Sequence, residues 1–225
     1  LDASESAAAR KRLAGTLTDG KKAGAPELVI SSALHLTRYG GLVTSSFRGE
    51  MGLFGATLFS GSTLDQINGW ARSRTNGRIS SILQKLHPNS VCVLLNATYF
   101  KGEWQDPFSK KRTGPAPFQL VDGTLTQAET MKATAPFRVL RGHSYLAVSL
   151  PYRNSSLAMV VIMPMWPSAL EQVTGFSGDS IRGVVAELAR SQPRRLGLWL
   201  PKFSVTSGGD LIEPVKELGL DLAFG

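Results

Sequence analysis

The sequence predicts a mixed α+β fold, and three observations support that prediction. Segments with helical spacing lie towards the two ends of the chain, whereas strand-like segments dominate residues 91–165. A protein built from βαβ units would instead alternate strands and helices along its length. With 225 residues, 42% of them hydrophobic and 19% charged, the chain has the composition of an ordinary globular protein.

The first elements are expected before residue 60. A short helix is expected around residues 6–13, followed by the loose segment GKKAGAP. The segment ELVISSALHL (27–36) predicts a strand, because it is apolar and contains β-branched residues. The segment LVTSSFRGEMGLFG (42–55) predicts a helix that ends near Gly55.

A second helix is expected to begin at Ser62-Thr63. Asp65 follows these residues, which comes close to a capping box. Thr75-Asn76-Gly77 then predicts the end of this helix. The residues that share its apolar face are Leu64, Ile67 and Ala71, and another short apolar stripe follows at Ile79, Ile82, Leu83 and Leu86.

The segment VCVLLNATYFKGEW (91–104) predicts a strand in the middle of a sheet. From residue 91 to 100 it is apolar apart from Asn96 and Thr98. A strand with one wet face would alternate apolar and polar residues, so we expect both faces to be covered. Cys92, the single cysteine, is accordingly expected to be a small buried hydrophobic residue and not a nucleophile.

The second half of the chain predicts several strands and then helices. Strand signals recur from 115 to 165, in PFQLV, AETMKAT, FRVL, LAVSLPY and SLAMVVIMP. Asp179 is expected to cap a helix, and LGLWLPKF (196–203) alternates as a strand does. Asp210 is expected to begin a last helix that Gly219 ends.

The sequence offers no pattern that is typical of a catalytic or metal site. His35, His87 and His143 each lack a second ligand at metal spacing, so no metal and no cofactor are expected. The chain contains no G-x-S-x-G elbow and no phosphate-binding glycine fingerprint. A non-enzymatic protein is therefore predicted.

Three further features of the sequence limit which binding partners and which cellular compartment are expected. The net charge of +8 permits a polyanionic partner, but no aromatic residues interleave with the basic ones, so nucleic acid is not expected. No apolar run reaches 18 residues, so no membrane span is expected. The sequon at Asn154 lies in a predicted turn and is a candidate for glycosylation, whereas the sequon at Asn96 would be unreachable inside its strand.

Several motifs together resemble the serpin family of serine protease inhibitors. Their order and spacing agree from about residue 28 to 225, which covers nearly the whole chain. In chain order they are Ile67-Asn68-Gly69-Trp70, Thr75-Asn76-Gly77-Arg78-Ile79, the run from Leu95 to Trp104, Pro107-Phe108, Met131, Leu150-Pro151-Tyr152, Leu157-Ala158-Met159, Met163-Pro164, Leu200-Pro201-Lys202-Phe203, and Leu218-Gly219-Leu220-Asp221-Leu222-Ala223-Phe224.

The resemblance implies a serpin-like α+β fold, in which a large, mostly antiparallel central sheet packs on a second sheet with helices around it. Residues 91–104 match the third strand of the central sheet. Asn96 matches the polar residue of the shutter, where that sheet parts. Trp104 matches the aromatic residue of the breach, where the reactive loop first enters.

The implied activity is inhibition of a serine protease. The family offers an exposed loop, the protease cleaves it and becomes acylated, and the loop inserts beside the third strand. We expect residues 1–225 to form a single domain truncated at both ends, so that the reactive bond is absent from this chain. The full-length parent is expected to be a monomer.

Partners and alternatives also follow from the resemblance. Residues 5–25 align with the helix that some serpins use for heparin, which makes Arg10, Lys11, Arg12, Lys21 and Lys22 candidates for binding a sulfated polysaccharide. Secretion is expected, although intracellular serpins exist. A non-inhibitory carrier, chaperone or storage protein, or a polyanion-binding module, are the alternatives to an inhibitor.

Overall fold

The computed structural model describes residues 23–38, 43–53, 55–205 and 216–217. The chain divides into two compact units, which we describe separately: residues 1–107 with 134–196, and residues 108–133 with 197–225. The helix expected at 6–13 lies outside the described residues, as does the helix expected from Asp210, apart from residues 216–217, which are helical. The prediction of one domain over 1–225 stays a prediction.

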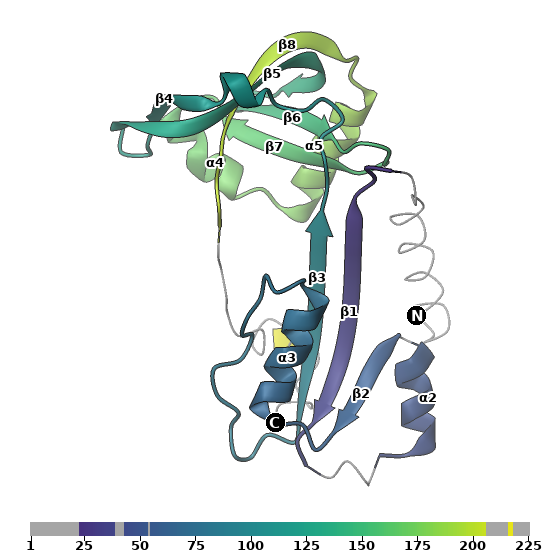
Figure 1. The fold of residues 1–225 in the computed structure, drawn as a ribbon. Coiled ribbons are helices and arrows are strands. Elements are labelled where there is room, and N and C mark those ends of the chain that lie inside the picture. Colours follow the sequence, from purple (N-terminus) through teal and green to yellow (C-terminus); the bar gives the residue numbers. More distant parts are fainter. Residues whose placement is uncertain (1–22, 39–42, 54, 206–215, 218–225) are drawn as a thin grey trace. The chain divides into compact units, whose positions relative to one another are not determined.

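The first unit contains a three-stranded sheet with the order β2-β1-β3 (Figure 1). β1 pairs with β2 in parallel and with β3 in antiparallel fashion, and the latter register places Ala33 opposite Leu95. The strands predicted at 27–36 and within 91–104 are confirmed. Their bounds are β1 (Glu27–Leu36), β2 (Ala56–Ser60) and β3 (Cys92–Lys101).

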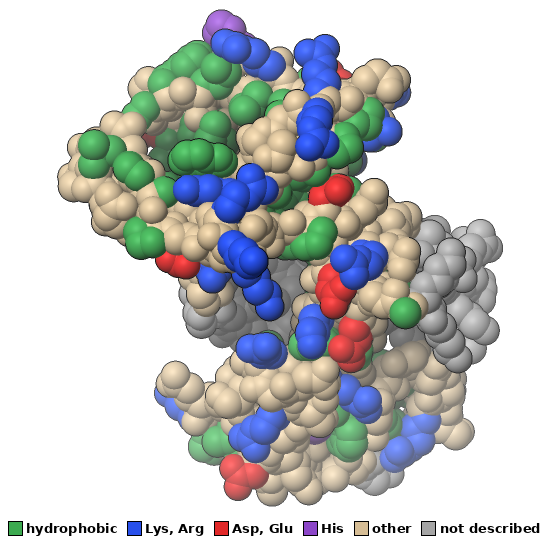
Figure 2. All heavy atoms as spheres, turned by 45° about the horizontal axis from the view of Figure 1, so that its top comes forward, with side chains coloured by type: hydrophobic (Ala, Val, Ile, Leu, Met, Phe, Trp, Pro, Cys, Tyr) green, Lys and Arg blue, Asp and Glu red, His purple; other side chains and the backbone are tan. Residues whose placement is uncertain are grey.

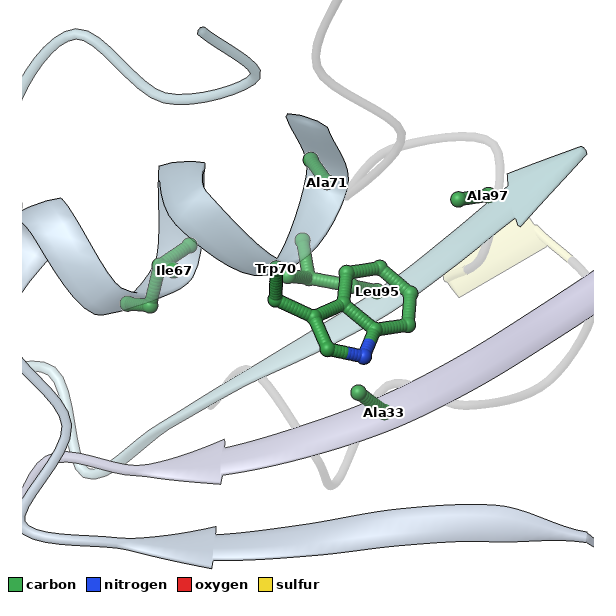
Figure 3. Packing of buried hydrophobic residues seen from close by; sticks show 6 residues of the cluster. All are labelled: Ala33, Ile67, Trp70, Ala71, Leu95 and Ala97. Atoms are coloured by element: carbon green, nitrogen blue, oxygen red, sulfur yellow. The ribbon is translucent and has the colours of Figure 1, made fainter. Parts of the chain in front are cut away.

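Helix α3 (Leu64–Arg74) packs on this sheet and confirms the predicted helix. Thr63 is its N-cap, and the third helical residue that completes the capping box is Gln66, not the predicted Asp65. Figure 3 shows the indole of Trp70 between α3 and the strands β1 and β3. The buried cluster comprises Ala33, Ile67, Trp70, Ala71, Leu95 and Ala97.

Helix α2 (Ser45–Leu53) is shorter than the helix predicted at 42–55. The side chain of Thr44 accepts a hydrogen bond from the backbone N–H of Phe47 at 3.2 Å, which fixes the start of the helix after Thr44. At the other end, Gly55 has a φ of 64°, a left-handed conformation that terminates helices. The end predicted at Gly55 is therefore two residues late.

The same unit contains a second packed layer. β6 lies between β5 and β7, and helix α5 packs against it through Val184 and Leu188, which cluster with Ala147. Ser177 caps α5 by accepting a hydrogen bond from the N–H of Ser180, so the cap predicted at Asp179 is wrong by two residues. The elements are β6 (Tyr145–Pro151), β7 (Ala158–Pro164), η3 (Pro167–Ala169), α4 (Leu170–Thr174) and α5 (Gly178–Arg190).

The second unit contains β4 (Gly114–Gln119) and the 3-10 helix η2 (Lys110–Arg112). β5 (Leu125–Arg141) belongs partly to each unit, since its first residues pair with β4 and its last residues pair with β6. The predicted segments AETMKAT and FRVL are thus one continuous strand. β8 (Arg194–Pro201) pairs with β5 and begins two residues before the predicted strand.

The predicted α+β class is confirmed, although β2 (Ala56–Ser60) was not predicted and lies between two helices. Among the described residues, no helix has both the length and the apolar content needed to cross a bilayer.

Candidate functional site

The outer edge of β3 is one of the two edges of the three-stranded sheet on which no described strand lies, and the other belongs to β2. β1 pairs with one edge of β3 along its whole length, and none of the described residues forms a strand on the other edge. An unpaired edge presents a row of N–H and C=O groups that can bond an added strand. In the described part of the chain, β3 is therefore an edge strand whose outer backbone groups can pair with an added strand.

The two faces of β3 differ, which corrects the prediction that both are covered. Leu95 and Ala97 point towards α3 and are buried. On the opposite face Leu94 is 72% exposed, Asn96 is exposed, and Phe100 is 38% exposed. Among the described residues α3 covers one face, together with Leu83 and Leu86 of the segment after it, which pack against the same buried cluster. Cys92 lies on the other face and is exposed, so its predicted burial is also wrong.

A cavity of about 380 Å³ adjoins the second half of β3. Four consecutive residues of the strand line it, so that it follows the strand itself and not one face alone. The turn after α3 forms its other wall. The lining residues are Thr75, Arg78, Ile79, Thr98, Tyr99, Phe100 and Lys101.

The wall that α3 supplies is held by hydrogen bonds to the helix. The hydroxyl of Thr75, which is 1% exposed, donates to the carbonyl of Ala71 at 2.8 Å and accepts from the N–H of Ile79 at 3.0 Å. Gly77 has a φ of 76°, a conformation that suits glycine in this tight turn. A movement of α3 would therefore move this wall of the cavity.

A second set of hydrogen bonds connects the segment after this turn to α3. The side chain of Asn68 donates to the carbonyl of Leu83 at 2.8 Å. Its oxygen accepts from the N–H groups of Ile82 and Leu83 at 2.9 and 3.0 Å. The segment with the apolar stripe at 79–86 is a connection of bends that Asn68 bonds to α3.

The far end of β3 joins the turn between β6 and β7. Trp104 stacks on Tyr152, with ring centroids 4.7 Å apart and planes at 15°, and Phe100 meets the same ring edge-on at 4.8 Å. Backbone bonds reinforce the contact, since the N–H of Arg153 donates to the carbonyl of Glu103 at 2.8 Å. Burial raises the pKa of the Tyr152 phenol above its ordinary value, so the ring stays neutral near pH 7.

Gly102 is required by this packing. A Cβ at residue 102 would lie 2.6 Å from Cδ1 of Tyr152 and 3.1 Å from Cζ of Phe100. Both distances are too short for an ordinary contact. Glycine at position 102 therefore leaves the space in which the rings of Phe100, Trp104 and Tyr152 pack at the end of β3.

Asn96, the predicted shutter residue, lies in the middle of β3. Its Nδ2 donates to the Ser32 hydroxyl of β1 at 3.1 Å, and its Oδ1 accepts from the Thr98 hydroxyl at 3.5 Å. The side chain is exposed, so the prediction that its sequon is unreachable is wrong for the described residues. Its role as a shutter residue stays a prediction.

The other predicted site residues fall into two groups. Asn154 is exposed in the turn after β6, has a φ of 51°, and donates from Nδ2 to the carbonyl of Ala23 at 2.8 Å. Arg10, Lys11, Arg12, Lys21 and Lys22 lie outside the described residues.

No cluster of metal ligands occurs in the described ranges of the chain. On the face shown in Figure 2, Lys and Arg side chains outnumber those of Asp and Glu. Ion pairs between described residues include Arg153 with Glu103 at 3.0 Å and Arg182 with Asp179.

Sequence reasoning missed the part played by two residues near the sheet. Tyr152 was recognised within a motif, but nothing in the sequence showed that it stacks on Trp104. The sequence shows His35 only as a histidine without a metal-binding partner, whereas the side chain is 1% exposed and contacts Trp70 of α3. The position of His35 among the apolar residues of the strand at 27–36 could have predicted that its side chain is buried.

Comparisons with known proteins agree with this geometry. A family model described as Serpin (serine protease inhibitor) matches residues 37–225. Serpin B11 of Mus musculus is 30% identical over 167 residues, which cover 72% of this chain and 43% of that protein. The chain thus spans about half the length, or less, of curated relatives that it matches.

Solved structures share the fold. Thyroxine-binding globulin complexed with thyroxine-fluorescein superposes with a TM-score of 0.81 at 22% identity, covering 97% of this chain and 66% of that one. Cleaved kallistatin complexed with heparin gives a TM-score of 0.79 at 24% identity, covering 92% of this chain and 63% of that one. The large sheet, its partner sheet and the surrounding helices expected from the motifs are therefore those of a shared fold.

Proposed function

The chain belongs to the serpin family, and we propose that the protein containing it inhibits serine proteases by adding a strand to the free edge of β3. The observation that carries this proposal is the open edge of β3 beside a cavity of about 380 Å³. Serpins as a family are protease inhibitors and not enzymes. The inhibitory activity of this member is the proposed part.

The proposed reaction begins outside these 225 residues. The serine hydroxyl of the protease attacks a carbonyl carbon of an exposed loop, an ester forms, and the amine of the cleaved peptide bond leaves. The freed loop then inserts next to β3. Each inserted residue exchanges bonds to water for backbone bonds to β3, and its alternate side chains become buried.

Three features of the described residues suit this insertion. The stacked rings of Trp104 and Tyr152 hold the end of β3 at the β6–β7 turn, so that the strand stays in place while its edge is filled. The turn around Thr75 lies beside the second half of β3, where Thr75 bonds it to α3 and Asn76 donates to the carboxylate of Glu27 in β1 at 3.4 Å. Asn96 bonds to β1, which leaves the backbone of the outer edge available.

An assay of covalent complexes tests the inhibitor proposal. The full-length protein is incubated with trypsin-like, chymotrypsin-like and elastase-like serine proteases, and the products are separated under denaturing conditions. We expect one of them to form a denaturant-resistant ester adduct, and the cleaved protein to gain thermal stability. Cleavage of the loop without any adduct, and without a rise in melting temperature, would instead support a non-inhibitory carrier or storage protein.

A sulfated polysaccharide is the second proposed partner. The structural likeness to a kallistatin–heparin complex, the net charge of +8 and the basic residues between 10 and 22 support it. A variant with Arg10, Lys11, Arg12, Lys21 and Lys22 replaced by alanine should elute from immobilised heparin at lower salt.

The matched control for that variant removes Lys110, Lys111 and Arg112, the exposed residues of η2. Loss of retention in the control, with none in the five-residue variant, would assign heparin binding to a different surface. Equal small losses in both would indicate attraction by net charge alone.

Secretion with a glycan on Asn154 is proposed on similar grounds. The side chain is exposed and lies in a turn, as an acceptor site requires. Expression in a secretory host should yield a protein whose mass falls after enzymatic deglycosylation, and Asn154→Gln should abolish that mass difference. Accumulation of the unglycosylated native protein inside its cells would favour the intracellular alternative.

A further inference from the structure

We propose that His35 is an acid-sensitive lock between α3 and the sheet of β1, β2 and β3. Proton uptake by its imidazole loosens α3 and thereby frees the wall of the cavity at the β3 edge. The lock itself is a property of the fold. Only its consequence for strand addition rests on the function proposed above.

His35 is one of the largest fully buried side chains of the described chain, at 1% exposure. It stacks on Phe59 of β2, with centroids 4.5 Å apart and planes at 12°. It meets Trp70 of α3 edge-on at 6.1 Å and 77°. The imidazole thus lies where α3 packs on the sheet.

The hydrogen bonds of the imidazole satisfy only one of its two ring nitrogens. Nδ1 lies 2.9 Å from the hydroxyl of Ser62, which is itself 6% exposed. Nε2 is buried and has no partner in the described part of the chain. An imidazolium carries two N–H donors, so protonation would place a buried N–H of a cation without an acceptor.

The surroundings offer no opposite charge to an imidazolium. β2 presents Phe59, β3 presents Val93 in register with His35, and α3 presents Trp70. The remaining contact is Ser62, so no titratable or charged side chain among these neighbours faces the ring. The charged residues of α3, namely Asp65, Arg72 and Arg74, are exposed.

The direction of the pH effect follows from burial. Desolvation lowers the pKa of His35 below its ordinary value of 6.5. The unfolded or locally opened chain then binds the proton more tightly than the packed chain does. The stabilisation is complete above pH 6.5, and it is lost progressively as the pH falls from 6.5 towards the lowered pKa. The ring face of Phe59 attracts a cation weakly, which reduces this effect without reversing it.

The residues between α3 and the sheet offer few polar groups that could stabilise the positive charge of an imidazolium. The indole Nε1 of Trp70 is also buried without a partner in the described residues. Two unsatisfied buried groups therefore meet at one helix–sheet contact. Because Thr75 bonds both α3 and Ile79 of the cavity wall, loosening the helix at His35 also loosens the residues that line the cavity beside β3.

Amide hydrogen exchange of the full-length protein at pH 7.5 and pH 5.0, corrected for the intrinsic pH dependence of exchange, tests the lock. We expect protection of α3 and of the turn at 75–79 to fall by about fivefold or more at pH 5.0. The variant His35→Phe keeps an aromatic ring in the stack but cannot titrate, so its fall should be less than about twofold.

The exposed histidines supply the control. His87→Gln combined with His143→Gln removes every other histidine of the chain and should leave the acid response of α3 unchanged. An equal fall in His35→Phe and in the unaltered protein would overturn the proposal. So would a loss of the response in the His87/His143 control.

A second measurement does not depend on the folding of His35→Phe. In the His87→Gln/His143→Gln protein, the single remaining imidazole within residues 1–225 is that of His35, and its NMR titration reports the pKa directly. A value well below 6.5 supports the lock, whereas a value of 6.5 or above would contradict it. Neither measurement uses a protease, so failure of the inhibitor proposal would not be mistaken for failure of the lock.

Discussion

β3 and β6 have similarly apolar sequences but different surroundings. β5 and β7 flank β6 on both edges, and α5 covers the face that carries Ala147, while Val148 and Leu150 on the other face are buried as well. β3 has one paired edge and one covered face, and Leu94 is 72% exposed. An apolar sequence thus indicates that a strand can be buried on both faces, but it does not show whether other segments cover those faces. In this protein the strand with an exposed apolar face, β3, is the one that the motifs connect with function.

Trp70→Ala should produce the largest effect, because it empties the α3 core that holds the covered face of β3. The indole is 6% exposed and lies among Ala33, Ile67 and Leu95 (Figure 3). We expect the free energy of unfolding to fall by about 3–5 kcal/mol in urea titrations followed by circular dichroism.

Trp199→Ala is the control for the tryptophan variant. Trp199 is 63% exposed, and its ring contacts the ammonium group of Lys132 at 4.3 Å. Its removal should cost about 1 kcal/mol or less. Similar losses at Trp70 and Trp199 would show that α3 does not depend on the indole.

The two faces of β3 can be compared by truncating neighbouring leucines. Leu95→Ala should cost about 2–4 kcal/mol, because Leu95 is 7% exposed in the α3 core. We expect Leu94→Ala to change the free energy of unfolding by no more than about 0.5 kcal/mol, since Leu94 is 72% exposed. A loss of about 2–4 kcal/mol in the full-length protein would instead show that another segment covers this face.

Gly102→Ala tests the junction that joins β3 to the β6–β7 turn. The added methyl would collide with Tyr152, and the expected loss is about 1–3 kcal/mol in the free energy of unfolding. Gly183→Ala in α5 is the matched control. Nothing lies within 4 Å of a Cβ there, so alanine should stabilise the helix by about 0.5–1 kcal/mol. A neutral result at Gly102 would mean that the stacked rings move freely.

Glu103→Gln should have the smallest effect. Its carboxylate pairs with Arg153 at 3.0 Å, but the two side chains are 65% and 42% exposed. Exposed pairs contribute little and are screened by salt, so the loss should stay within about 0.5 kcal/mol and vanish in 1 M NaCl. A larger loss that persists in high salt would reveal a contact of Glu103 beyond this ion pair.

The sequence predicted the elements better than their surroundings. Periodicity located α3, because the residues that produce the pattern, such as Ile67 and Ala71, are the ones that become buried, and apolar composition located the strand at 27–36. It misjudged the far face of β3 and the burial of Cys92, because apolar composition cannot show which covering segment is in contact. The wall of the cavity depends on side-chain bonds of Thr75, and the segment after it on those of Asn68, and periodicity predicts neither.

The most direct test of the account is hydrogen exchange along β3 in the full-length protein, before and after a serine protease cuts its exposed loop. We predict that β3 amides on the edge away from β1 exchange at least about tenfold more slowly after the cut, because an added strand bonds them. Unchanged exchange at these amides after complete cleavage would contradict strand addition at β3.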